Sequence, residues 1–191
     1  MKIKIELSFW AMISLAIALD MIGSWALLMI AAAIHEAGHL ICIIAFGGRI
    51  EQITAMMGGF DISYTGISSY KGDVFVALSG PFANFFTAML VSLYFAGTGN
   101  CFAGINLMLC IFNLIPVQPL DGGRALCALF EWISPLAGEK TFTMFSASLS
   151  MVLFAISIGA CFESMRAIWS AIMFGIILSR QQLGQIYKET I

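Results

Sequence analysis

Residues 74–120 read VFVALSGPFANFFTAMLVSLYFAGTGNCFAGINLMLCIFNLIPVQPL, and none of these 47 positions carries a charge. A single helix needs about 20 apolar residues to cross the hydrocarbon core of a membrane, so the run is long enough for two spans. The sequence Gly97-Thr98-Gly99-Asn100 separates its two halves and has the composition of a turn. The stretch therefore predicts a pair of membrane-spanning helices.

The composition of the whole chain leads to the same conclusion. Of its 191 residues, 60% are hydrophobic and 10% are charged, whereas about 25% are charged in an ordinary soluble domain. A soluble protein of this size has too much surface to hide that many apolar side chains, so lipid is the expected solvent. The net charge of −2 and the lack of a basic patch exclude nucleic acid as a partner.

We expect an all-α membrane protein with about six transmembrane helices, forming a single polytopic domain over residues 1–191. The first helix is interpreted as a retained span, because no small-residue cleavage site follows it. The fourth is long and broken by Pro116 and Pro119. The predicted spans are residues 7–22, 24–46, 74–96, 101–130, 141–161 and 166–180.

The basic residues predict the orientation of these spans. If both termini are cytoplasmic, eight of the nine basic residues fall on the cytoplasmic side and only Arg166 falls outside, as the positive-inside rule requires. The eight are Lys2, Lys4, Arg49, Lys71, Arg124, Lys140, Arg180 and Lys188.

The segment between the second and third spans has a different character. Residues 50–64 are too polar to span a membrane, yet apolar side chains recur on both sides of Gly58-Gly59, a pair suited to a hairpin turn. This pattern predicts a small membrane-associated β-hairpin or sheet. An irregular loop at the membrane interface is the alternative.

The second span contains the sequence His35-Glu36-Ala37-Gly38-His39. Residues four apart lie on one face of a helix, so the two imidazoles can share one metal ion. Glu36 is then placed to take a proton from a metal-activated water and return it to the leaving amine. Ionisable groups inside a membrane are costly, which favours function over a structural hydrogen-bond cluster.

A catalytic zinc ion takes three protein ligands and keeps one position open. Asp121, directly after the uncharged run, is the candidate third ligand. The neighbouring prolines would bend the helix, and the neighbouring glycines would let the backbone approach closely. Capping of a helix that restarts at the cytoplasmic edge is the alternative role for this carboxylate. Thiolate ligands are not expected, because the five cysteines are scattered and contain no Cys-x-x-Cys pair.

Three ordered motifs resemble those of the site-2 proteases, the intramembrane zinc metalloproteases. The His-Glu-x-x-His motif is the first, Ser79-Gly80-Pro81-Phe82-Ala83-Asn84 resembles the family's Gly-Pro-x-x-Asn motif, and Asn113 to Gly123 resembles its Asn-x-x-Pro-x-x-Pro-Leu-Asp-Gly-Gly motif. The resemblance covers residues 24–130, which would be the catalytic core. The PDZ and CBS domains of larger relatives have no counterpart here, so the chain resembles a minimal core.

The resemblance implies a role for each matching residue. His35, His39 and Asp121 would bind one zinc ion, and Glu36 would be the general base and acid. Asn84 and Asn113 match asparagines that position the substrate or stabilise the developing oxyanion, although hydrogen bonding between helices is an equally good reading of both. Gly80 and Pro81 are assigned to backbone shape.

The resemblance also implies a substrate class. The substrate would be a single-pass membrane protein, such as an anti-sigma factor, a pro-sigma factor or a membrane-anchored transcription regulator. The predicted topology would place the active site of this multi-pass plasma-membrane protein in the cytoplasmic half of the bilayer, because the second and fourth spans both run from outside to inside with the metal-binding residues past their middle. A helical substrate must unwind to be cut, and the predicted hairpin would accept the unwound segment as an added strand.

Two other classes of protein fit part of the pattern. A non-hydrolytic membrane metal-binding protein or transporter would explain the intramembrane polar groups, but it leaves Glu36 between the two histidines without a purpose. A di-iron desaturase or hydroxylase needs more histidines than the two in this chain.

Overall fold

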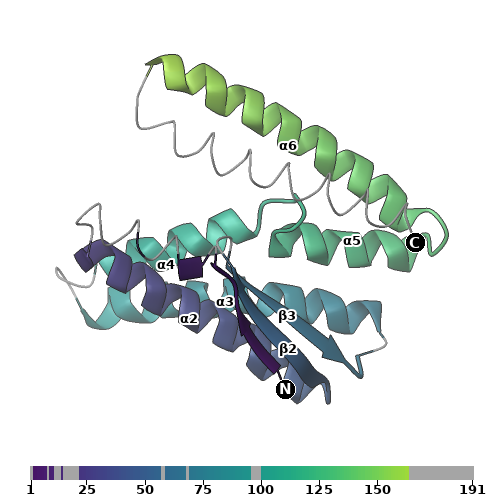
Figure 1. The fold of residues 1–191 in the computed structure, drawn as a ribbon, viewed down its shortest axis with the longest axis horizontal. Helices are drawn as coiled ribbons and strands as arrows, with labels where there is room; N and C mark the ends of the chain where they lie inside the picture. The colour runs from purple at the N-terminus through teal and green to yellow at the C-terminus, as the bar shows by residue number, and fades with distance from the viewer. Residues whose placement is uncertain are drawn as a thin grey trace. The chain divides into compact units, whose positions relative to one another are not determined.

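The computed structural model describes residues 2–7, 9, 10, 14, 22–56, 59–67, 69–95 and 100–163. The chain divides into two compact units, Met1–Asn113 and Leu114–Ile191. Its elements, in chain order, are β1 (Lys2–Ile5), α2 (Ile22–Ala45), β2 (Arg49–Met56), β3 (Gly59–Thr65), α3 (Tyr70–Tyr94), α4 (Asn100–Asn113), α5 (Asp121–Ile133) and α6 (Gly138–Glu163) (Figure 1).

Helices α2, α3 and α6 are long and apolar enough to cross a membrane, over Trp25–Ala45, Tyr70–Tyr94 and Gly138–Ile158. They correspond to the second, third and fifth predicted spans. Large apolar side chains on these helices lie exposed, as expected for surfaces that face lipid. The sixth predicted span and most of the first lie outside the described residues, so the count of six stays a prediction.

The fourth predicted span, residues 101–130, is two helices instead of one. Helix α4 ends at Asn113 and α5 begins at Asp121. Pro116 and Pro119 have no N–H to donate to a helical ladder, and the chain between the helices turns through local bonds. The Val117 N–H donates to the carbonyl of Ile115 (2.8 Å), and the Leu120 N–H donates to that of Val117 (2.9 Å).

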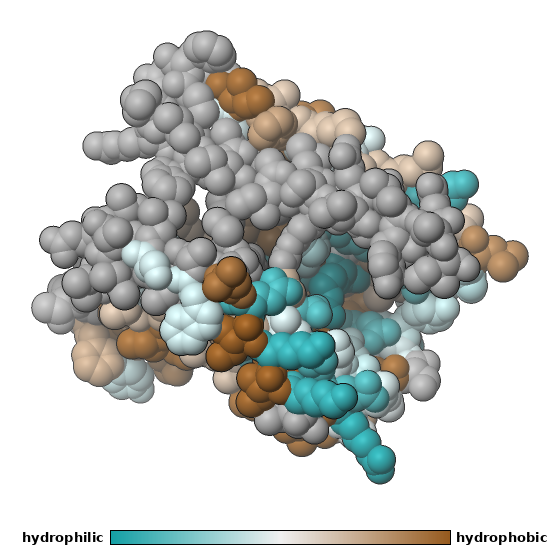
Figure 2. Space-filling view, in the orientation of Figure 1, coloured by the Kyte–Doolittle hydropathy of each residue, from teal (hydrophilic) through white to brown (hydrophobic). Residues whose placement is uncertain are grey.

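The predicted hairpin is confirmed and belongs to a three-stranded sheet with the order β1-β2-β3. Strands β2 and β3 pair antiparallel, with Ile53 opposite Ile62. Strand β1, which the sequence analysis did not predict, pairs parallel with β2, and Lys2 lies opposite Gln52. All four β1 residues are exposed, and Figure 2 shows hydrophilic and hydrophobic side chains side by side over this part of the molecule.

The sheet packs on the helices of the first unit through a small apolar cluster. Ile43 of α2, Ile62 of β3 and Val76 of α3 are buried together. The hydroxyl of Tyr64 on β3 also donates to Asp73 Oδ1 at the start of α3, at 2.9 Å. These contacts fix the sheet against the segments of α2 and α3 that follow and precede the motif residues.

A glycine pair ends α2 and turns the chain directly into β2. Gly47 has a φ of +75°, which favours glycine. Its N–H donates to the carbonyl of Ile44 (2.9 Å), and the Gly48 N–H donates to that of Ile43 (2.8 Å). This is the Schellman arrangement of a helix C-terminus. The sheet therefore begins only two turns of helix after His39.

Candidate metal centre

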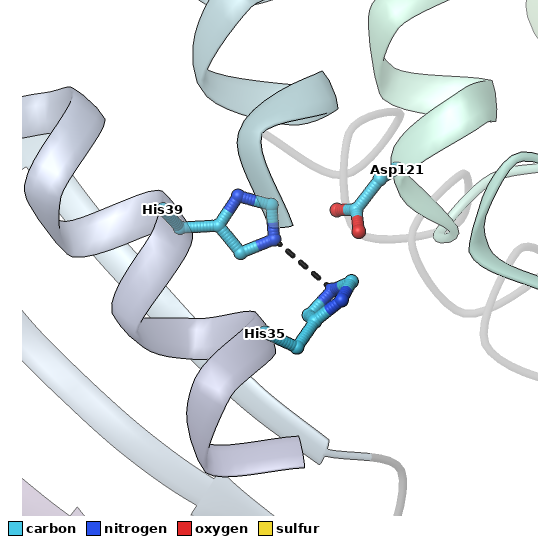
Figure 3. Close-up of side chains that lie close together, drawn as sticks. All are labelled: His35, His39 and Asp121. Carbon is cyan, nitrogen blue, oxygen red and sulfur yellow. Dashed lines mark hydrogen bonds between the residues drawn. The ribbon is translucent and has the colours of Figure 1, made fainter. Parts of the chain in front are cut away.

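His35 and His39 project from one face of α2, as their spacing predicts, and both are buried. The two rings are turned toward one another (Figure 3). They lie edge to face, and the angle between their planes is 82°. Their Nε2 atoms are 3.2 Å apart. The structure thus brings the two predicted ligand atoms together within the first unit.

The proton of His39 is placed by a backbone carbonyl. His39 Nδ1 lies 2.8 Å from the oxygen of Val76 on α3. A carbonyl oxygen only accepts hydrogen bonds, so Nδ1 carries the proton and Nε2 presents a lone pair. The hydroxyl of Ser79 donates to the same Val76 oxygen, at 2.6 Å, and holds it in place.

His35 is oriented by Asn84 of α3, which is fully buried. The Asn84 Nδ2 donates to the carbonyl of Ala31 at 3.2 Å, which fixes the direction of the amide. Its Oδ1 therefore faces His35 Nδ1, at 3.1 Å, and accepts that ring's proton. His35 Nε2, like that of His39, is left with a lone pair.

Two lone pairs at this separation fit a shared cation. A hydrogen bond between the Nε2 atoms would require an additional proton on one of the rings, since both Nδ1 atoms already carry one. Tetrahedral zinc with Zn–N bonds of about 2.0–2.1 Å places two ligand nitrogens about 3.3–3.4 Å apart. The observed 3.2 Å is close to this separation. The two imidazoles therefore suit a tetrahedral metal ion.

Gly80 leaves room for these ligand atoms. A Cβ at this position would overlap His39 Nε2 and come within 2.8 Å of His35 Nε2. The sequence analysis assigned Gly80 to backbone shape, and the structure places its Cα directly beside the Nε2 atoms of both candidate ligands. Gly38 has a related role on α2, because its Cβ would lie 2.7 Å from the Ser79 carbonyl oxygen and hold α2 and α3 apart.

Glu36 is half-buried and follows His35 on α2. This position places it beside the histidine pair in sequence and on the same turn of helix. Its assignment as general base stays a prediction.

Asp121 belongs to the second unit, where it is the first residue of α5 and is buried; Figure 3 labels it on that helix. Leu120 occupies the N-cap position, and its apolar side chain makes no capping hydrogen bond. Asp121 therefore lies inside the first turn, where the helix dipole favours a carboxylate. The guanidinium of Arg124, one turn later, is 4.0 Å from Asp121 Oδ1.

Two glycines shape the backbone around Asp121. A Cβ on Gly122 would overlap the carbonyl of Leu114, and one on Gly123 would overlap the backbone of Val117. The segment before α5 therefore folds directly over the start of that helix. The hydroxyl of Ser146 on α6 accepts from the Gln118 N–H, at 2.8 Å, and fastens the same segment.

The two predicted asparagines differ in their surroundings. Both Nδ2 hydrogens of Asn84 are used, one by Ala31 and one by Asn106 Oδ1 at 3.2 Å, so this amide has no donor left for an oxyanion. Asn113, at the end of α4, donates to the carbonyl of Leu109 on its own helix, at 3.0 Å. It makes no hydrogen bond to either histidine in the described part of the chain.

Asn106 is the residue that the sequence analysis missed. It is fully buried on α4 and bonds to Asn84. The available signal was an amide within the apolar run, two helical turns before Asn113 and therefore on the same helix face.

Cys127 is a buried cysteine of α5, outside the three membrane-length helices. Burial, together with a hydrogen bond from its thiol to Glu131, raises the pKa of Cys127 to about 12. The thiol therefore stays protonated at neutral pH.

Comparison with known sequences identifies related proteins. Residues 98–157 match the model of the family described as Peptidase family M50. The chain is 28% identical over 139 residues to Stage IV sporulation protein FB of Bacillus subtilis, covering 69% of this chain and 48% of that protein. It is 27% identical over 207 residues to a protein of Methanocaldococcus jannaschii named as a zinc metalloprotease, covering 99% of this chain and 60% of that protein.

A solved structure has the same fold. The site-2 protease from Methanocaldococcus jannaschii matches with a TM-score of 0.72 and 23% identity, over 95% of this chain and 89% of that one. The chain spans only 48% and 60% of the length of the two curated relatives. These findings confirm the resemblance to the site-2 proteases that the three motifs predicted.

Proposed function

We propose that this chain, a relative of the site-2 proteases of peptidase family M50, is a zinc-dependent protease that cleaves a transmembrane segment of a membrane protein. One observation carries the proposal. Two buried imidazoles on an apolar helix present their Nε2 lone pairs to each other at 3.2 Å, and each ring is oriented by a dedicated hydrogen bond. Such a pair is stable in a membrane when a cation lies between its nitrogens.

Asp121 is proposed as the third ligand. His35, His39 and Asp121 are all buried, and each offers one ligand atom. Two imidazoles and one carboxylate form a donor set used by catalytic zinc sites, which keep a fourth position for water or substrate. When bound, zinc supplies a Lewis acid that polarises the scissile carbonyl and makes a water nucleophilic at neutral pH.

The residues of the chain then divide the remaining work. Glu36 takes the proton of the attacking water and delivers it to the leaving amine. Asn84 positions His35, because its amide is fully engaged by neighbouring groups. Asn113 remains the candidate oxyanion donor, since its Nδ2 has a second hydrogen beyond the one that bonds to Leu109.

The substrate is proposed to be a single-pass membrane protein that carries a signal, such as an anti-sigma factor, a pro-sigma factor or a membrane-anchored transcription regulator. The apolar helices α2 and α3 that carry the motif support cleavage within the bilayer. The distribution of basic residues supports a plasma-membrane protein with cytoplasmic termini and an active site in the cytoplasmic half.

The decisive experiment compares wild type, Glu36→Gln and Asp121→Ala during co-expression with tagged membrane substrates. Glu36→Gln removes the base and keeps the ligands, so it should abolish cleavage while the purified protein retains one zinc ion. Asp121→Ala should lose both cleavage and zinc. A Glu36→Gln variant that still cleaves, or an Asp121→Ala variant with full zinc content, would contradict the proposal.

A further inference from the structure

The hydrogen bonds that orient His35 begin on a third helix. Asn106 of α4 donates its Nδ2 to the carbonyl of Phe102, at 2.9 Å. Its Oδ1 accepts from Asn84 Nδ2, at 3.2 Å, and Asn84 Oδ1 in turn accepts from His35 Nδ1, at 3.1 Å. Both asparagines are fully buried.

The chain of bonds has one direction. The Phe102 carbonyl can only accept, so the Asn106 amide must turn its nitrogen toward Phe102 and its oxygen toward Asn84. Asn84 must then offer its nitrogen to Asn106 and its oxygen to His35. Every group in the series has its role set by the one before it.

We propose that Asn106 is a positioning residue that holds His35 in its metal-binding tautomer through Asn84. This inference rests on the proposed zinc site. If the Asn84 amide were reversed, its Nδ2 would face His35 Nδ1, which would have to give up its proton. That proton would move to Nε2 and remove the lone pair that binds the metal. Asn106 and Ala31 together oppose this reversal.

A purely structural role for Asn106 is a polar tie between α3 and α4. Such a tie would affect the stability of the fold but would leave the tautomer of His35 unchanged. The two roles therefore differ in zinc affinity, in the tautomer of His35 and in the coupling of Asn106 to Asn84.

The test measures zinc affinity of the purified full chain by competition with a chelator. Asn106→Leu removes the acceptor at similar volume and should weaken zinc binding about 10- to 100-fold, the range found when an outer hydrogen bond to a metal ligand is lost. Asn106→Asp keeps an oxygen for Asn84 and should bind zinc within a few-fold of wild type. Thr87→Val is the matched control, because among the described residues that hydroxyl donates only to the Ala83 carbonyl of its own helix.

A double-mutant cycle isolates the path of the effect. If Asn106 acts through Asn84, then Asn84→Ala combined with Asn106→Leu should lose no more affinity than Asn84→Ala alone. Nitrogen NMR of the zinc-free protein should also show a larger fraction of the Nε2–H form of His35 in Asn106→Leu. The two histidines are the only ones in the chain, which simplifies assignment.

Each outcome has a distinct meaning. Failure of the wild type to bind zinc would overturn the proposed function. Zinc binding by wild type with additive losses in the cycle, or with unchanged affinity in Asn106→Leu, would overturn the positioning role alone. If Asn106→Leu does not fold, Asn106→Ala replaces it, and the comparison with Asn106→Asp decides in the same way.

Discussion

At the scale of single residues, Gly80 packs directly against both histidines of the candidate site. Its missing side chain is the space in which two Nε2 atoms approach each other. A sequence motif identifies such a glycine by position but gives no reason for it, because the reason is a contact between α2 and α3. Asn106 escaped prediction for a related reason, since an isolated amide in an apolar run has many structural uses.

Gly80→Ala should therefore abolish or strongly weaken zinc binding, by at least about 10-fold, because the new methyl group would displace both rings. Chelator competition measures the effect. Gly104→Ala on α4 is the matched control, because a Cβ there meets nothing within 4 Å, and its zinc affinity should equal that of wild type. Equal affinities in the two variants would contradict the role given to Gly80.

At the scale of elements, local patterns predicted the parts of the chain that fold through local bonds. The hairpin follows from Gly58-Gly59 between two apolar runs, and α2 and α3 follow from length and hydrophobicity. Strand β1 pairs in parallel with residues about fifty positions later, and no local signal specifies such a partner. The prolines in residues 101–130 predicted a break in this span. They did not predict how many residues would separate α4 from α5.

The outer edge of β3 offers a test of substrate pairing. In the order β1-β2-β3, this strand has β2 on one side only among the described residues. Among positions 60–64, proline should replace each residue whose backbone N–H points away from β2. These substitutions should weaken cleavage with unchanged zinc content, since an added substrate strand would lose a backbone hydrogen bond. Positions whose N–H faces β2 are the contrast, because proline there should also lower the thermal stability. Cleavage that is unchanged at every outward position would refute strand addition.

At the scale of the whole molecule, composition predicted a membrane protein, and three described helices have the length and apolar character that this requires. The three motifs also predicted a resemblance to the site-2 proteases, and the chain is similar in sequence to peptidase family M50 and in fold to a solved site-2 protease. The number of spans and their direction rest on the sequence alone. The number of spans was predicted from the apolar runs, and their direction from the asymmetric distribution of basic residues.

Reporter fusions can test this topology. A reporter that is active only in the cytoplasm should be active at both termini and inactive when inserted within residues 97–100, and a reporter that is active only outside should give the opposite result. The physical reason is the placement of eight of nine basic residues on the cytoplasmic side. The same activity of one reporter at residue 191 and within residues 97–100 would contradict the predicted orientation.

Val76 contacts both the histidine pair and the sheet of the first unit. Its carbonyl orients the ring of His39, and its side chain is buried between the sheet and the helices. If His39 binds the proposed metal, loosening of the strands would also disturb its ring, and by thermodynamic reciprocity an ion bound between the imidazoles would stabilise the sheet. Metal binding and the stability of the sheet would therefore be thermodynamically linked.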